Sequence, residues 1–134
     1  MHRGALIAAA VLVLASAGAA AQSPEGSIAS IVGKGEYRPG QQRSWAPAKV
    51  KQDLFNLDWV QTLDMSRMAL RFKDGSTINL GPNSEFHVIK VATPQSPGTI
   101  MEINRGRVWT QEKTSQGGLQ IRTSSALAAV RGTD

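Results

Sequence analysis

The residues of this sequence that could do chemistry are densest in residues 71–84, RFKDGSTINLGPNS. A catalytic loop would need a base close to Ser76 or a second carboxylate close to Asp74, and the sequence has neither nearby. A calcium loop requires several oxygen ligands at regular spacing, whereas DGSTIN contains a single acid. Asp74-Gly75 between two alternating segments is typical of a tight hairpin turn of the primed type, with positive φ at its centre. We therefore expect a turn between two strands.

Other catalytic and metal-binding patterns find little support. His2 lies in the N-terminal segment, which leaves His87 as the sole later histidine and too few ligands for a zinc site. There is no G-x-S-x-G element for a Ser-His-Asp site and no glycine-rich phosphate loop that opens a helix. The absence of cysteine excludes disulfides and thiol chemistry. We expect no enzyme, cofactor or metal, although a carboxylate-dependent hydrolase assembled from distant acids stays open as an alternative.

The best binding candidates are basic and aromatic. Alternation along NRGRVWTQ predicts that Arg105, Arg107 and Trp109 lie on one face of a strand, and Arg122 lies on a later strand. A tryptophan flanked by arginines suits a glycan, an acidic peptide or the sheet edge of a partner protein. The alternative is that Trp109 covers the margin of the core while the arginines keep the edge soluble. The candidate binding face comprises these four residues.

The first 21 residues predict export. A basic start at His2 and Arg3 precedes an apolar run over residues 5–15, and small residues lead to Gln22. This order is that of a cleavable signal peptide, and the run is shorter than the roughly 20 residues that a membrane helix needs. An uncleaved anchor is the alternative. We expect a signal peptide over 1–21, an exposed lead-in over 22–26, a domain over 27–134, no stable membrane span, and a periplasmic or secreted location.

The charge balance gives weaker guidance. Fifteen Lys and Arg face ten Asp and Glu, for a net charge of +5. Such an excess attracts acidic surfaces, such as headgroups or anionic glycans, or it only keeps the protein soluble. Basic residues form no stripe with interleaved aromatics, and we therefore expect no nucleic-acid partner.

The elements that must position these residues are strands. Apolar and polar residues alternate in MALRF and STINL, and turn clusters separate further alternating segments. In residues 52–72, Leu54, Leu57, Val60 and Leu63 recur at helical spacing, but the segment has few helix formers, and two short strands or turns are favoured over a helix. Expected strands cover residues 27–32, 68–72, 76–80, 85–92, 99–111 and 119–132. A weak periodicity of about 20 residues suggests an all-β domain, either a twisted β-solenoid-like stack or a flattened sandwich.

Four ordered segments resemble the FecR-type domain, a family named after the periplasmic regulator of iron-citrate transport. They are LDWVQT, with Asp58 and Thr62 in matching places and Leu57 where glycine is usual, then MALRFKDGSTINLGPNSEFHV, INRGRVWTQ, and IRTSSALAAVRGT, with Ser125 near the usual proline. The resemblance covers about residues 28–133.

The resemblance implies an exported, non-catalytic domain that binds a protein or a cell-envelope component such as a glycan, and that senses or relays a signal in the envelope. The transport regulators add a cytoplasmic anti-sigma segment and a membrane helix. This sequence shows only the signal peptide, and the anti-sigma activity is not carried over. Family members usually continue past Arg-Gly-Thr, which leaves open whether the native protein extends beyond Asp134. The alternative is a structural scaffold for such a C-terminal region.

Overall fold

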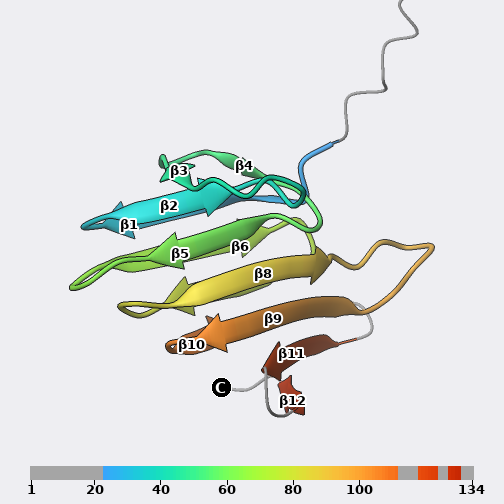
Figure 1. The fold of residues 1–134 in the computed structure, drawn as a ribbon. Helices are drawn as coiled ribbons and strands as arrows, with labels where there is room; N and C mark the ends of the chain where they lie inside the picture. The colour runs from blue at the N-terminus through green and yellow to red at the C-terminus, as the bar shows by residue number, and fades with distance from the viewer. Residues whose placement is uncertain (1–22, 112–117, 124–126, 131–134) are drawn as a thin grey trace, which may run out of the picture.

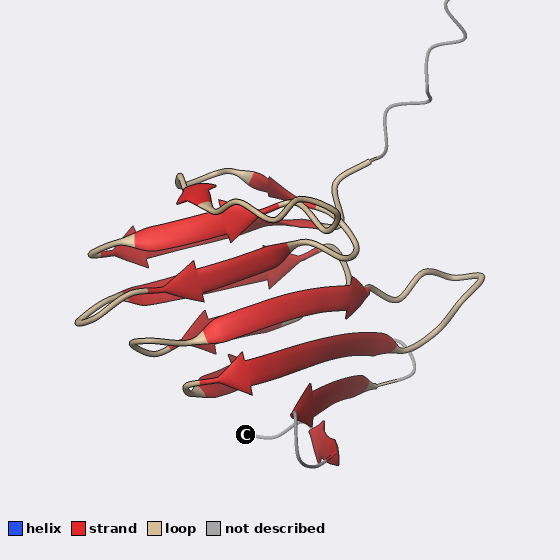
Figure 2. Cartoon of the chain, in the orientation of Figure 1, coloured by secondary structure: helices blue, strands red, loops and turns tan. Residues whose placement is uncertain are grey.

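The fold consists of two facing β-sheets in a computed structural model that describes residues 23–111, 118–123 and 127–130 (Figure 1). The five-stranded sheet has the order β10 (Val108–Gln111), β7 (Thr77–Leu80), β6 (Arg67–Phe72), β1 (Gly26–Val32) and β4 (Asp53–Leu54). The seven-stranded sheet has the order β12 (Leu127–Val130), β11 (Leu119–Thr123), β9 (Thr99–Arg105), β8 (Glu85–Lys90), β5 (Trp59–Thr62), β2 (Gly35–Arg38) and β3 (Ala46–Pro47). The described residues contain no helix, which confirms the all-β, sandwich-like prediction (Figure 2).

Strands joined by a short corner lie in different sheets, as β1 and β2, β5 and β6, and β9 and β10 do. In the view of Figure 1, β2, β5 and β9 lie in front of β1, β6 and β10. Most neighbours within the sheets are antiparallel, whereas β11 pairs with β9 in parallel. The predicted signal peptide over residues 1–21 lies outside the described residues, as does Ser125 of the closing motif.

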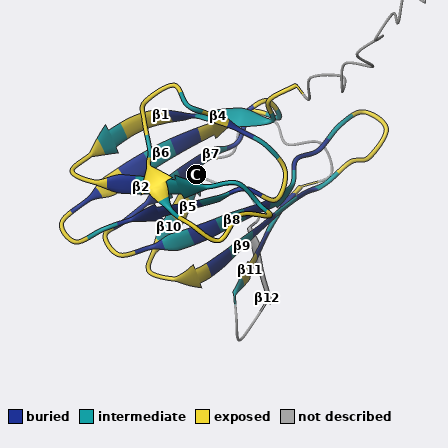
Figure 3. Cartoon of the chain, turned by 45° about the horizontal axis from the view of Figure 1, so that its top comes forward, coloured by how far each residue is buried: buried dark blue, intermediate teal, exposed yellow. Residues whose placement is uncertain are grey.

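The core lies between the sheets and follows the period-two pattern of the sequence. In β6, Met68, Leu70 and Phe72 are buried, while the residues between them point outward (Figure 3). Pairing of Leu70 with Ile78 of β7 continues this buried face into the next strand. Because burying one such side chain contributes about 1.5–3 kcal/mol, the alternation fixes which face of each strand turns inward.

Two long predicted strands were wrong, because the chain turns within each of them. Residues 99–111 form β9 and β10 in different sheets, with Gly106 between them at φ +91°. The described residues within 119–132 form two strands, β11 and β12, which pair with each other in antiparallel orientation. The short strands β4 and β5, by contrast, confirm the expectation of two short elements in residues 52–72.

The turn at Asp74 is a hairpin turn, as predicted, but it is not of the primed type. Only Gly75 has a positive φ, of +94°. The amide of Gly75 donates to the carbonyl of Phe72, and the amide of Phe72 donates to the carbonyl of Ser76. This pattern describes a three-residue loop with glycine in the left-handed position, which closes a hairpin as effectively as a two-residue turn.

Corners at one end of the sandwich carry the chain from one sheet to the other. Each of the four corners has a residue with positive φ, which reverses the chain within a few residues. These residues are Gly33, Met65, Asn83 and Gly106. Leu57, in the family position where glycine is usual, also has a positive φ, of +74°. The glycine preference at that position therefore reflects backbone conformation rather than chemistry.

Buried hydroxyl groups join successive corners. The Ser84 hydroxyl accepts a hydrogen bond from the amide of Arg107 at 2.9 Å and lies 3.1 Å from the carbonyl oxygen of Arg107. The Thr62 hydroxyl donates to the carbonyl of Gly81 at 2.6 Å and accepts from the amide of Ser84 at 2.9 Å. A Cβ atom at Gly106 would collide with Ser84. Thr62, Ser84 and Gly106, which belong to the motifs that resemble the FecR-type domain, therefore have a structural role.

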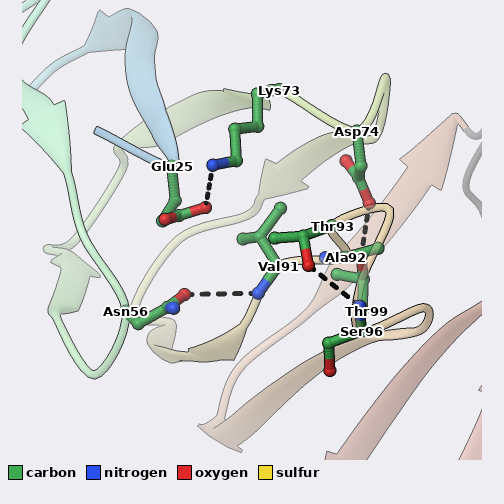
Figure 4. Close-up of polar contacts among 9 residues, drawn as sticks. All are labelled: Glu25, Asn56, Lys73, Asp74, Val91, Ala92, Thr93, Ser96 and Thr99. Atoms are coloured by element: carbon green, nitrogen blue, oxygen red, sulfur yellow. Dashed lines mark hydrogen bonds and ion pairs between the residues drawn. The ribbon is translucent and has the colours of Figure 1, made fainter. Parts of the chain in front are cut away.

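Asp74 joins the sheets at the opposite end (Figure 4). Its carboxylate accepts hydrogen bonds from the amide and the hydroxyl of Ser76, each at 2.9 Å, and from the hydroxyl of Thr99. Thr99 in turn accepts the amide of Ala92 at 3.0 Å. The polar loop that first suggested chemistry therefore ties the β6–β7 turn to the β8–β9 connection.

We predict that Ser84→Ala lowers the free energy of unfolding by about 1–3 kcal/mol, because the amide of Arg107 loses its acceptor, the hydroxyl of the buried Ser84. Urea denaturation monitored by circular dichroism measures the change. Ser96→Ala is the matched control, because Ser96 is exposed and its hydroxyl donates no hydrogen bond among the described residues. Equal stability of the two variants would contradict the role assigned to the corner hydroxyl.

Candidate binding faces of the two sheets

The structure divides the four predicted binding residues between two surfaces. Arg105 and Arg122 belong to the seven-stranded sheet, whereas Trp109 belongs to β10 of the five-stranded sheet and Arg107 immediately precedes it. The prediction that Arg105, Arg107 and Trp109 share one face of one strand was wrong, because the corner at Gly106 separates them. Each outer face therefore has to be considered by itself.

A row of residues crosses the outer face of the seven-stranded sheet. Register pairs link Arg38 to Trp59, Trp59 to His87, His87 to Glu102, and Glu102 to Arg122. We call this set of five residues the aromatic row. Its members come from β2, β5, β8, β9 and β11, with an arginine at each end and Glu102 beside Arg122. Cross-strand neighbours of this kind stabilise a sheet through their side-chain contacts.

Stacked rings occupy the centre of the aromatic row. The Trp59 and His87 ring centroids lie 3.7 Å apart with an interplanar angle of 9°. The guanidinium carbon of Arg38 lies 4.8 Å from the centroid of Trp59 and 5.0 Å from that of Trp45, so that the cation contacts two indole rings. Arg38 also donates to the carbonyl of Gln42 at 2.6 Å, which fixes the loop after β2. The cation–π contacts therefore hold this loop against the sheet.

A second row on this face consists of hydrogen-bonded polar residues. The Gln61 amide donates to Glu36 at 2.6 Å and accepts from the Arg105 guanidinium at 2.9 Å. Arg105 also lies 3.8 Å from Glu85, which accepts a hydrogen bond from Asn104 at 2.8 Å. Arg105, one of the predicted binding residues, is thus engaged by side chains of its own sheet.

His87 lies at the centre of the aromatic row, and its surroundings shift its pKa. Its Nε2 lies 3.0 Å from the carbonyl oxygen of Leu57, which places the proton of the neutral ring on Nε2. Its Nδ1 is buried without a hydrogen-bond partner, 4.0 Å from a carboxylate oxygen of Glu102. Burial lowers the pKa of His87 below 6.5, and this effect outweighs the Leu57 carbonyl and the Glu102 and Asp58 charges, which favour protonation, while Arg38 opposes it.

Asp58, directly before β5, and Tyr37 of β2 form a contact between neighbouring strands of the same sheet. The buried Asp58 carboxylate accepts the amide of Phe55 at 2.9 Å and the hydroxyl of Tyr37 at 2.6 Å. Burial and this neighbouring carboxylate raise the pKa of the Tyr37 phenol. Asp58 therefore accepts a backbone hydrogen bond beside Trp59, and its contact to Tyr37 adds a tie to β2.

The outer face of the five-stranded sheet differs in its charge pairing. Arg67 and Arg71 of β6 and Arg107 beside β10 are exposed. Among the described residues, none of these three guanidinium groups has a carboxylate within ion-pair distance. The described acids on this side include Asp53 of the edge strand β4 and Glu25 before β1, which pairs with Lys73 at 2.8 Å. Within the part of the chain that the structure describes, the three arginines therefore have no acidic partner.

Trp109 lies on β10, the strand at one edge of this sheet. It pairs in register with Asn79, its ring reaches toward Gly81, and 49% of its surface is exposed. Ser30, Ala69 and Asn79 continue its register row across the sheet toward β1. We call the surface formed by Arg67, Arg71, Arg107 and Trp109, with the small polar residues between them, the arginine face.

Arg67 and Arg71 were not among the predicted site residues, although the sequence contained the signal. Alternation in β6 buries Met68, Leu70 and Phe72, and therefore turns both arginines outward. The sequence did not show which strand lies next to β6. Pairing through β7 brings this strand to the same face as Trp109.

The described part of the chain provides no group of three or more histidines, aspartates and glutamates that could hold a metal ion. Within the same residues, no helix has the length and apolar character needed to cross a membrane.

We predict that acidification through the range just below pH 6.5 destabilises the fold through His87. The folded-state pKa is lowered, and the unfolded chain therefore binds more protons there and stability rises with pH. NMR titration of the ring should give a pKa below 6.5, and Glu102→Gln should lower it further. Asp53→Asn, on the opposite sheet, should leave it unchanged. A His87 pKa above 6.5 would refute this electrostatic account.

Comparison with known proteins gives one match, which agrees with the sequence motifs. The sequence model described as FecR protein matches residues 58–134, more than half of the chain. No curated protein and no solved structure gives a significant match. The matched region begins at the buried Asp58 and includes the corner residues Thr62, Ser84 and Gly106. On this match, together with the ordered motifs, the chain belongs to the FecR family.

Proposed function

We propose that this protein is an exported, non-catalytic domain of the bacterial envelope that works by binding, and that the arginine face is its binding surface. Membership of the FecR family suggests an envelope-signalling domain. The observation that carries the proposal is the difference in charge pairing between the two outer faces.

The paired face fits a structural role. Arg105 is satisfied by Gln61 and Glu85, and Arg38 is held between two tryptophans. A partner that used these groups would first have to break their contacts. Arg67, Arg71 and Arg107 make no such contacts among the described residues. A partner could therefore bind them without breaking contacts of this kind. Complementary charge on a partner would then increase both the rate of association and the selectivity.

A binding role also fits the groups that catalysis would have needed. His87 is stacked on Trp59 and directed at the Leu57 carbonyl, and is not free to serve a substrate. The Asp74 carboxylate accepts three hydrogen bonds that close a turn. These commitments support a non-catalytic function.

Export is the first testable part of the proposal. We predict that the protein expressed in a Gram-negative host is recovered from the periplasm with Gln22 at its N-terminus, because the small residues before it suit signal peptidase. N-terminal sequencing and fractionation measure this outcome. A chain that keeps Met1 and remains with the membrane would favour the uncleaved anchor instead.

The binding surface is the second testable part. We predict that immobilised protein retains a component of envelope extract, and that Trp109→Ala and Arg107→Gln each reduce the retained amount at least severalfold, since tryptophan and arginine side chains often contribute most of the binding energy. Mass spectrometry and sugar analysis identify and quantify the retained material.

Arg122→Gln is the matched control for this experiment. Arg122 is an exposed arginine on the opposite sheet, and its substitution removes the same charge. Retention should be unchanged in this variant if the arginine face binds the component. Equal retention by all the variants would exclude the arginine face, and selective loss in Arg122→Gln would assign binding to the seven-stranded sheet.

A further inference from the structure

The arginine face presents three cations at separated points. Arg67 and Arg107 lie toward the corners of the sandwich, and Arg71 lies four residues along β6 from Arg67. Four residues of an extended strand span about 13 Å, and two strand spacings separate Arg107 from β6 by about 10 Å. An extended anion could contact all three arginines together, whereas a small anion would reach them less readily.

Hydrogen-bonding groups fill the space between the arginines. Ser27 pairs with Arg71, which pairs with Thr77, which pairs with Gln111, so that hydroxyl and amide groups flank this cation. Asn79 occupies the adjacent row beside Trp109. Such short polar groups donate and accept hydrogen bonds at the surface of the sheet, as sugar hydroxyl groups require.

Trp109 adds an apolar platform at the edge of these polar rows. Its ring extends from its position beside Asn79 toward Gly81. An indole ring offers a broad apolar surface with a negatively polarised face, which attracts the C–H groups of a sugar ring. Its exposed fraction of 49% leaves part of that surface available.

The apolar content of the face argues against a peptide ligand. The described part of the chain exposes five large apolar side chains, of which only Val32 and Trp109 belong to the five-stranded sheet. Peptide recognition depends on apolar anchors that enter pockets, and the small residues of the central rows provide little for such anchors to pack against. Charge complementarity therefore has to supply much of the attraction.

We propose that the arginine face binds an extended glycan that carries carboxylate groups. The carboxylates pair with Arg67, Arg71 and Arg107, and a sugar ring stacks on Trp109. This inference rests on the proposed binding function and specifies its ligand class. A carboxylate accepts two parallel hydrogen bonds from one guanidinium group, which makes arginine better suited than lysine to this task.

The test uses defined polymers and the purified, exported protein. Isothermal titration calorimetry compares alginate, a polymer of uronic acids, with neutral dextran, poly-L-glutamate and phosphatidylglycerol vesicles. We expect alginate to bind more tightly than the other three, and its affinity to fall between low and physiological salt because screening weakens exposed charge pairs. Dextran tests whether charge is needed, whereas poly-L-glutamate tests whether the sugar is needed.

Variants locate the alginate site. Arg67→Gln and Arg107→Gln should each weaken alginate binding by about fivefold, and Trp109→Ala by about tenfold. Asn79→Asp preserves the size of the side chain but adds a negative charge at the centre of the face, and should weaken binding by about fivefold or more. Arg122→Gln and Asn56→Asp are the matched controls away from the arginine face, and we expect no change.

Circular dichroism establishes that each variant is folded, and the isosteric Asn79→Asp keeps the test valid if Trp109→Ala proves unstable. Failure of alginate to bind, or equal weakening by Arg122→Gln, would overturn the glycan site. Tighter binding of poly-L-glutamate or vesicles through the same arginines would also overturn it, while leaving the proposed binding function intact. If the envelope component is retained equally by the wild type and by the variants of the arginine face, the arginine face itself is rejected.

Discussion

Buried hydroxyl groups at the corners determine how the two sheets are joined. Ser84 accepts the amide of Arg107, and Gly106 approaches it so closely that a Cβ atom would collide. Ser66 has the equivalent place beside Gly33, and its hydroxyl accepts the amide of Lys34 at 2.8 Å. A buried amide without an acceptor costs about 1–3 kcal/mol, a sizeable part of the stability of a small domain. These corners therefore fix which sheet each following strand enters.

The corners determine on which outer face each arginine lies, and therefore whether it meets side chains that pair with it. Arg105 ends β9 and meets Gln61 and Glu85, whereas Arg107, two residues later, lies beyond the corner on the other sheet. Exposed ion pairs contribute little stability, and the paired rows act mainly to keep one face electrically balanced. The arginines of the other face have no ion-pair partner within the part of the chain that the structure describes. We infer a binding surface from this contrast, rather than from net charge alone.

Much of the fold could be predicted from local pattern. Alternation in residues 68–72 and 76–80 predicted β6 and β7, and it also turned Arg71 outward. The candidate site was predicted only in part, since Trp109 and Arg107 share a face but Arg105 does not. The sequence NRGRVWTQ continues the alternation through Gly106, and nothing local distinguishes a glycine within a strand from one that turns the chain. Position 106 has no room for a side chain because Ser84, which lies 22 residues away in sequence, packs against it.

The sequence by itself determined the all-β class, the inward and outward faces of most strands, and the family. These properties depend on period-two burial and on local motifs, which operate within a few residues. Only the tertiary structure decided which strands are neighbours. The aromatic row joins Arg38, Trp59, His87, Glu102 and Arg122 from five separate strands, and the arginine face joins β6 to β10 through β7. Strand register depends on contacts between distant segments, and therefore the pairing of charges, on which the proposed function rests, emerges only in the folded chain.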